Sequence, residues 1–295
     1  MQKGVKFRID PNKEQQTIIN QTLGCCRLIY NKGLAMRNEA YQNGNKIGYS
    51  QTSAMLTGLK KSDDFAFLKA VDSIALQQSL RDLDRGFVNF FQKRASHPTF
   101  KSKHNHHQSY RTINQGDNIR IVGKYIKLPK SGFVKIRQTM GVEKINNVTI
   151  ERTPTNKYFA VLNVKFEPQP MSNKGGKIGI DVGIKEFYSD SNGNVVYNPK
   201  YLEKSMRKLM REQRKLSRKE KGSTNRNKQR VKVALVHEKI TNQRNDFLQK
   251  QSTMLIRENQ TICIEDLKVK NMMRNHKLAQ HIGSASWSKF FDMLS

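Results

Sequence analysis

The stretch KIGIDVGIKEF, residues 177–187, decides how the second half of this chain folds. The apolar residues before Asp181 predict a short buried strand, and Gly183 allows a tight backbone turn after it. We therefore expect the Asp181 carboxylate to point into a cleft at the end of a strand. One aspartate cannot hold a divalent cation by itself, so its chemistry depends on the acidic residues that the fold brings beside it.

A second short apolar strand ends in acid at residues 261–267, TICIEDL. If this strand lies beside the first, Glu265 and Asp181 can converge on divalent cations, which activate water and stabilise the leaving oxygen in phosphodiester chemistry. Each motif is weak alone, because GIDVG also resembles the phosphate loop of actin-like and sugar-kinase ATPases. The order of the two strands, with a basic helical segment between them, favours nucleic-acid chemistry.

The charge of the chain predicts a polyanionic partner. Its 295 residues carry a formal net charge of +30, for which a phosphate backbone is the simplest match. An anionic membrane surface is the alternative, but no run approaches about eighteen apolar residues, and the N-terminal stretch lacks the apolar core of a signal peptide. The sequence therefore predicts a cytoplasmic, nucleoid-associated protein with no membrane partner.

Positive charge is concentrated in residues 200–244, where two long helices, 199–221 and 227–258, are predicted on either side of Gly222. Sixteen basic residues stand against four acidic ones there. A charge run is often a solvated face, but like charges one helical turn apart repel each other, which favours an external anion. The predicted nucleic-acid contacts of this segment are Arg207, Arg211, Arg214, Lys215, Arg218, Arg226 and Arg230.

The first half of the chain predicts helices followed by strands. Residues 1–9 read as a basic strand, and residues 10–96 as helices that are interrupted at Gly24 and at the Asn43-Gly44 turn. A polar loop follows over residues 97–110, in which Lys101 and Lys103 are predicted phosphate contacts. Five alternating strands are predicted between residues 112 and 167, as a small barrel or sandwich, and residues 168–176 read as a linker.

No zinc site is expected. The three cysteines, Cys25, Cys26 and Cys263, cannot form a four-thiolate site, and no Cys-x-x-Cys pair occurs. The clustered histidines at positions 104, 106 and 107 match no strong ligand spacing. We expect reduced thiols and a solvated, phosphate-contacting loop.

Several blocks of the sequence, in order, resemble the TnpB family of transposon-associated RNA-guided nucleases, which are related to type V CRISPR effectors. The blocks are RIDPNKEQQ, GCCRLIYNKGL, VDSIALQQSLRDLDRGFVNFF, HPTFKSKHNHHQSYR, GIDVGIKEFYSDSNG, YLEKSMRKLMREQRKLSRKEKGSTNRNKQR, HEKITNQRNDFLQKQS, ICIEDLKVKNMMRNHKLAQHI and SASWSKFF.

The resemblance implies an α+β multidomain fold. A wedge-type β-barrel would comprise residues 1–9 and 97–170, with a helical recognition lobe, residues 10–96, inserted into it. Residues 171–295 would form an incomplete RuvC domain of ribonuclease H-like fold, with long basic helices and no zinc finger.

The resemblance also implies roles and partners. Asp181 and Glu265 match catalytic acids that hold magnesium, and Ser73 and Gln77, one helical turn apart, lie where family members contact the duplex motif beside the target. The implied partners are a guide RNA and a double-stranded DNA target; the oligomeric state does not follow from the sequence.

The C-terminal part departs from the family pattern, in which SxSWxxF is followed by a four-cysteine zinc finger and a third catalytic aspartate. Asp292 comes too early to be that acid, so we expect a vestigial magnesium site that is not productive, and DNA binding without efficient cleavage. The expected function is repression of transcription by occupancy, as in the TldR group of TnpB-derived repressors. The alternative is a magnesium-dependent, RNA-guided DNA endonuclease of a transposon, present as a truncated chain.

Overall fold

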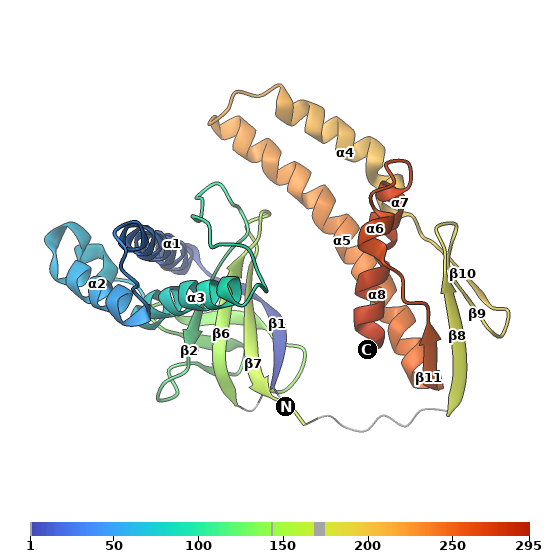
Figure 1. The fold of residues 1–295 in the computed structure, drawn as a ribbon, viewed down its shortest axis with the longest axis horizontal. Helices are drawn as coiled ribbons and strands as arrows, with labels where there is room; N and C mark the ends of the chain where they lie inside the picture. Colours follow the sequence, from blue (N-terminus) through green and yellow to red (C-terminus); the bar gives the residue numbers. More distant parts are fainter. Residues whose placement is uncertain (1, 143, 168–174) are drawn as a thin grey trace. The chain divides into compact units, whose positions relative to one another are not determined.

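The computed structural model describes residues 2–142, 144–167 and 175–295 and consists of two compact units, 1–168 and 169–295 (Figure 1). Most of the predicted linker, residues 168–174, lies outside the described residues. None of the described helices is both long enough and apolar enough to cross a membrane.

The first unit contains a curled, open sheet of seven strands. Its strands are β1 (Gln2–Asp10), β2 (Gln108–Ile113), β3 (Arg120–Val122), β4 (Tyr125–Leu128), β5 (Gly132–Arg137), β6 (Ile145–Arg152) and β7 (Tyr158–Lys165). They are hydrogen-bonded in the order β2-β6-β7-β1-β5-β4-β3, and all neighbours are antiparallel. The mixed helix-and-sheet class predicted from the sequence is confirmed, with a half-barrel in place of a closed barrel.

Strand β2 is the part of this sheet that the sequence did not predict correctly, because it begins at Gln108, inside the stretch expected to be a loop. Its buried residues Tyr110 and Thr112 lie opposite Ile150 and Val148 of β6. Pairing with this apolar strand gives β2 a buried face, which the composition of β2 alone does not predict. The five predicted strands and the N-terminal strand are all present.

Four helical segments complete the first unit: α1 (Lys13–Gln42), α2 (Tyr49–Lys61), the 3-10 helix η1 (Asp63–Lys69) and α3 (Ser73–Phe91). Asn12 and Gln15 form a reciprocal capping box at the start of α1. The predicted interruption at Gly24 is wrong, since α1 continues through it with Leu23 and Cys25 buried on either side. Residues of α1 and α3 share one hydrophobic core with the sheet.

Two glycines of α1 give a matched test of this packing. A methyl group on Gly33 would lie 2.8 Å from Leu80 Cδ2 and 3.1 Å from Leu83 Cδ2, whereas one on Gly24 would meet nothing closer than Arg27 Nη2 at 4.0 Å. Gly33→Ala is therefore expected to lower the free energy of unfolding by about 1–3 kcal/mol. Gly24→Ala should raise it by about 0.5–1 kcal/mol, because alanine is the better helix former.

Urea unfolding of the full chain, followed by circular dichroism, measures both effects. Trp287, the single tryptophan of the chain, lies in the second unit. Its fluorescence follows the unfolding of that unit and is the internal control, because neither substitution should change it. Equal effects of the two substitutions would contradict close α1–α3 packing at Gly33.

The second unit contains a smaller mixed sheet of β8 (Gly176–Val182), β9 (Glu186–Asp190), β10 (Val195–Tyr197) and β11 (Asn259–Ile264). Their order is β10-β9-β8-β11, with β11 parallel to β8 and the other neighbours antiparallel. The predicted Asn192-Gly193 turn joins β9 to β10, and Gly193 has a φ of 84°, which suits glycine.

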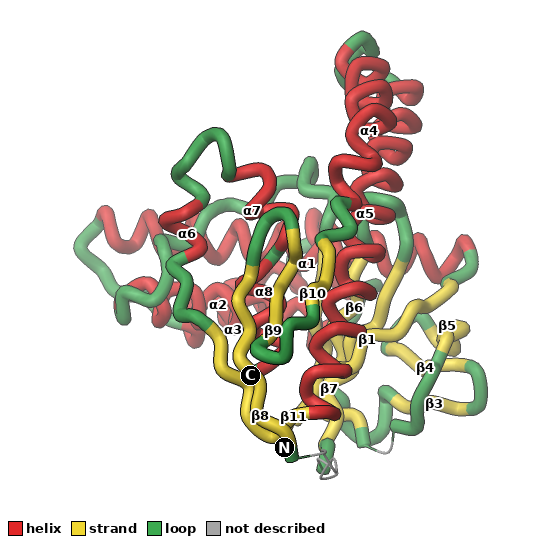
Figure 2. The backbone as a smooth tube through the Cα atoms, turned by 90° about the vertical axis from the view of Figure 1, so that its right-hand side faces the viewer, coloured by secondary structure: helices red, strands yellow, loops and turns green. Residues whose placement is uncertain are grey.

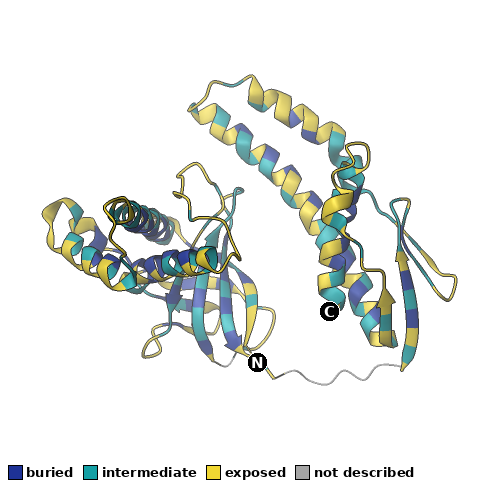
Figure 3. Ribbon diagram, viewed as in Figure 1, coloured by how far each residue is buried: buried dark blue, intermediate teal, exposed yellow. Residues whose placement is uncertain are grey.

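The helices of this unit are α4 (Tyr201–Ser217), α5 (Thr224–Glu258), α6 (Val269–Met272), α7 (Ala279–Ala285) and α8 (Trp287–Leu294). Helices α5 and α8 bury Leu248, Leu255 and Phe290 against Ile178 and Ile180 of the sheet. The α4–α5 hairpin has a small core of its own, and much of its surface is exposed (Figure 3). This hairpin confirms the two long basic helices predicted from the sequence.

Candidate nucleic-acid interface and acidic pair

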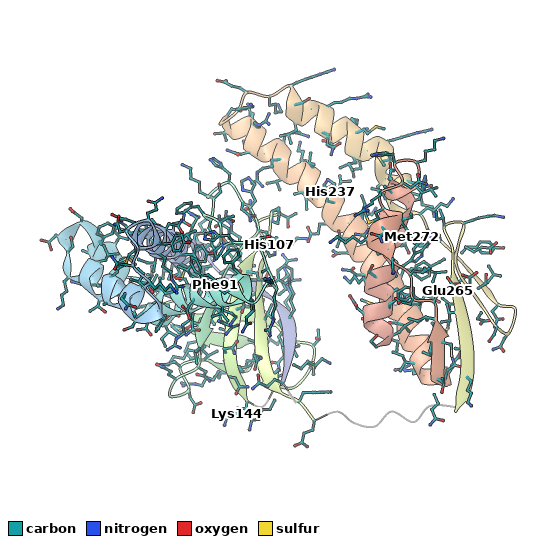
Figure 4. All side chains as sticks on the ribbon, in the orientation of Figure 1. Phe91, His107, Lys144, His237, Glu265 and Met272 are labelled. Carbon is teal, nitrogen blue, oxygen red and sulfur yellow. The ribbon has the colours of Figure 1, made fainter. Side chains whose placement is uncertain are left out.

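Asp181 and Glu265 occupy neighbouring positions at the ends of two parallel strands. Strands β8 and β11 are neighbours in the sheet of the second unit, whose backbone is drawn in Figure 2. Ile178 lies opposite Ile262 and Ile180 opposite Ile264, and the residue that follows each of the last two is one of the acids. Side chains alternate between the faces of a sheet, so Asp181 leaves the face opposite to Ile180. Both acids are exposed, and Glu265 lies just beyond the end of β11 (Figure 4).

Two carboxylates are suitable ligands for a hard cation such as Mg²⁺. Within residues 2–142, 144–167 and 175–295, however, no cluster of three or more His, Cys, Asp or Glu side chains could hold a metal. The acidic pair therefore fits a divalent cation only in part, because the remaining ligands would have to be water or substrate oxygens, or come from elsewhere. Cys263 lies opposite Gly179 on the same face as the pair and is exposed.

A basic groove lies along α4. Arg207, Arg211, Arg214 and Arg218 are spaced three or four residues apart and so share one face of the helix. Together with Met210 and Lys215 they line a groove of about 430 Å³. This set contains five of the seven contacts predicted for the basic segment.

One buried acid lies close to these arginines without neutralising them. The Nε2 atom of Gln229, on α5, donates a 2.7 Å hydrogen bond to Glu212 Oε2, and this bond lowers the pKa of Glu212. Glu212 also contacts Arg211 and Lys215, at 3.4 and 3.8 Å. Its main role is to connect α4 to α5, since a single carboxylate cannot balance five cations.

The other two predicted contacts of the basic segment lie outside the groove. Arg226 Nη1 donates hydrogen bonds of 2.8 Å to the backbone oxygens of Leu216 and Lys219. Both carbonyls lie at the C-terminal end of α4, where the intrahelical donors run out, although the Leu216 oxygen also accepts from Lys219 N–H at 3.2 Å. Arg226 therefore stabilises the turn between α4 and α5, and Arg230 is half-buried on α5.

Lys101 and Lys103 have different environments in the loop after α3. The Lys101 backbone N–H and C=O both pair with the side chain of Asn31, at 2.8 and 2.9 Å. Although the residue as a whole remains exposed, its ammonium group lies 4.1 Å from the centre of the Tyr30 ring, and desolvation lowers its pKa. Lys101 thus fixes the loop to α1, beside a cavity of about 450 Å³ that His107 also lines (Figure 4). Lys103 is exposed.

Ser73 and Gln77 are both exposed in the first turns of α3, as the predicted duplex contact requires. The structure adds Lys60, from α2, whose Nζ donates a 2.6 Å hydrogen bond to Ser73 Oγ. Burial lowers the pKa of Lys60. Lys60 could not be predicted from the sequence, because it belongs to a different helix from Ser73 and no local pattern connects the two residues.

Comparison with known proteins gives matches to both halves of the chain. Residues 152–276 match a family described as "Probable transposase", OrfB of IS605, and residues 1–46 match the "Helix-turn-helix domain" of the same group. In this structure, residues 2–46 contain β1 and the single continuous helix α1.

Two relatives align with most of the chain. A "Putative RNA-guided DNA endonuclease" of Streptomyces pristinaespiralis is 39% identical over 299 residues, covering 100% of this chain and 74% of that protein. The "Putative RNA-guided DNA endonuclease InsQ" of Escherichia coli K12 is 35% identical, covering 92% of this chain and 67% of that protein. A solved Cas12f1–sgRNA–target DNA complex aligns with 94% of this chain and 71% of that chain, with 13% identity and a TM-score of 0.49.

The open half-barrel with its helices and the small mixed sheet with its basic hairpin define a mixed α/β protein of the RuvC-containing class. Within that class, the chain belongs to the TnpB family, as its identity to full-length relatives shows.

Proposed function

We propose that this chain uses a guide RNA to bind a matching double-stranded DNA, and that Asp181 and Glu265 contribute to a DNA-cleaving centre. The observation that carries the proposal is the register of β8 and β11, in which the paired residues Ile180 and Ile264 are each followed by an exposed acid. The names of the two relatives, both RNA-guided DNA endonucleases, support it.

Three groups of residues have different roles in this proposal. The exposed arginines of α4 bind phosphates of the nucleic acid as a sequence-independent grip, while base pairing with the guide reads the target sequence. Ser73, Gln77 and Lys60 offer hydrogen-bonding groups to the duplex beside the target. A divalent cation held by Asp181 and Glu265 would activate water and stabilise the leaving oxygen.

A second function, guided binding that represses transcription by occupancy, is favoured by one observation. Within the described residues, no third His, Cys, Asp or Glu side chain joins Asp181 and Glu265 in a group that could hold a metal. With two ligands the cations are held weakly, and recognition by base pairing can then continue where cleavage is slow.

One assay tests both functions. The full chain, its cognate guide RNA, Mg²⁺ and a plasmid with the matching target are combined, and binding and cleavage are measured in parallel with a mismatched guide. Guide-dependent binding is expected. Guide-dependent cutting supports the endonuclease, binding without cutting supports the repressor, and the absence of guide-dependent binding contradicts both.

If the plasmid is cut, Asp181→Asn is expected to slow cleavage by at least about a hundredfold, because it removes a ligand of the cation itself. Guided binding should stay unchanged, since Asp181 is not among the residues that line the arginine groove. Asp292→Asn is the matched control, because Asp292 is an exposed acid on α8 of the same unit. Equal cleavage by the wild type and Asp181→Asn would exclude the acidic pair from the reaction.

A further inference from the structure

A cavity rich in aromatic side chains lies where the C-terminal ends of α1 and α3 meet the chain that follows α3. It has a volume of about 340 Å³ and includes Phe87, Phe90, Phe91, Tyr41 and His97 in its lining. Phe91 and Tyr41 are 72% and 77% exposed (Figure 4). Two exposed rings beside an apolar hollow form a contiguous patch, which is a feature of binding sites.

The walls of this aromatic pocket are held in place by contacts among themselves. The His97 ring meets Phe87 and Phe90 edge-on, with centroids 5.3 and 5.2 Å apart. The Arg37 guanidinium lies 4.3 Å from the centre of Phe87 and pairs with Asp84 at 3.0 Å. A pocket with prearranged walls loses little entropy when a flat ligand enters.

The turn after α3 brings His97 back onto the helix. Lys93 has a φ of 58°, a left-handed conformation that glycine usually supplies at this position. The backbone bonds from Lys93 N to Phe90 O, 2.9 Å, and from Arg94 N to Asn89 O, 2.8 Å, close the turn. A lysine therefore occupies the turn position at which glycine would fit the backbone better, and Arg94 follows it in the chain.

The lining also offers groups that can read the edge of a base. His97 Nδ1 lies 2.8 Å from the Pro98 carbonyl oxygen, so in the neutral ring it donates there and leaves Nε2 as an acceptor. The side chains of Asn38, Asn45 and Lys46 also line the pocket, and no acidic residue is part of the lining. Flat rings, hydrogen-bonding groups and cations together are the features by which proteins bind unpaired nucleobases.

We propose that the aromatic pocket binds one unpaired nucleobase of RNA, extruded from a helix and stacked on Phe91 or Tyr41. The proposal rests on the RNA-binding part of the proposed function and extends it to a specific site. The volume is at the lower end for ligand sites, which range over about 300–1,000 Å³, and suits a single base. A second copy of this chain is a poor occupant, because two chains of net charge +30 repel each other.

The test uses the full chain and two RNA hairpins that differ in one nucleotide, a bulged 2-aminopurine or an abasic bulge. The wild type is expected to bind the 2-aminopurine hairpin about 5- to 100-fold more tightly than the abasic one, and to quench the fluorescence of the bulged base. Phe91→Ala and Tyr41→Ala should weaken this preference and the quenching. Phe67→Ala should keep both, because Phe67 is a 48% exposed phenylalanine on η1, outside the pocket.

Each other outcome overturns the proposal in a distinguishable way. If the wild type binds both hairpins equally tightly, the pocket does not bind the bulged base, but the proposed function is not contradicted. Failure to bind either hairpin contradicts both the pocket and the RNA-binding function. If Phe91→Ala reduces the sedimenting mass of the protein but not its preference for the base, the pocket is a contact between copies of the chain.

Discussion

Replacing Arg207, Arg211, Arg214 and Arg218 by glutamine is expected to lower the affinity of the chain for the proposed guide RNA by roughly 100- to 1,000-fold at physiological salt. These four side chains share one exposed face of α4 and line its groove. Each phosphate contact that is lost also removes the release of a counterion, so the slope of log affinity against log salt should fall by about 3. Fluorescence anisotropy with labelled RNA at several salt concentrations measures both quantities.

A control of equal charge separates the groove from the net charge of the chain. Lys250, Arg257, Lys270 and Lys277 are exposed, belong to the same unit and lie outside α4. Changing these four residues to glutamine removes the same charge but leaves the row of arginines on α4 intact. The affinity for RNA is therefore expected to fall by less than about tenfold. If both variants lose the same affinity, α4 contributes only its net charge, and the groove is not a specific binding site.

Phe290→Ala is expected to lower the free energy of unfolding of the second unit by about 3–5 kcal/mol, because it leaves a large cavity in the core. The Phe290 side chain is 0% exposed, and its ring lies 4.9 Å from Phe187 and 6.0 Å from Tyr188, measured between centroids. These contacts hold α8 against β9, the strand that pairs with the Asp181 strand. Urea unfolding followed by the fluorescence of Trp287, which is 2% exposed, measures the loss.

The neighbouring residue on the same helix provides the control for this substitution. Phe291 is only half-buried, so Phe291→Ala should cost less than half as much. A loss below about 1 kcal/mol for Phe290→Ala would contradict the packing of α8 described above.

The parts of the fold that the sequence predicted are those with a local signal. The apolar runs before Asp181 and Glu265 have the length of strands, and the Asn192-Gly193 turn predicts a hairpin. The prediction that the run before Glu265 is buried is wrong, because no residue of β11 is fully buried. If both runs form strands and these strands pair in parallel, the two acids that follow them lie close together. The spacing of Arg207 to Arg218 likewise predicts one face of a helix, because it follows the helical period.

The parts that the sequence did not predict depend on contacts between distant residues. Nothing local distinguishes Arg226, which binds backbone carbonyls, from the exposed arginines of α4. The bond from Lys60 to Ser73 joins two helices, and the aromatic pocket exists because the chain reverses at Lys93 and returns His97 to α3. Strand β2 is ordered by its partner β6, which alternation within residues 97–110 cannot reveal.

The distribution of the three thiols provides an experimental handle on the acidic pair. Cys25 and Cys26 are buried in the first unit, and burial raises the pKa of both thiols, so they react slowly with alkylating reagents. Cys263 is exposed two residues before Glu265. A maleimide dye or spin label should therefore attach at this one position in the unmodified protein, and its signal would report directly on the arrival of a cation or a nucleic acid at that edge of the sheet.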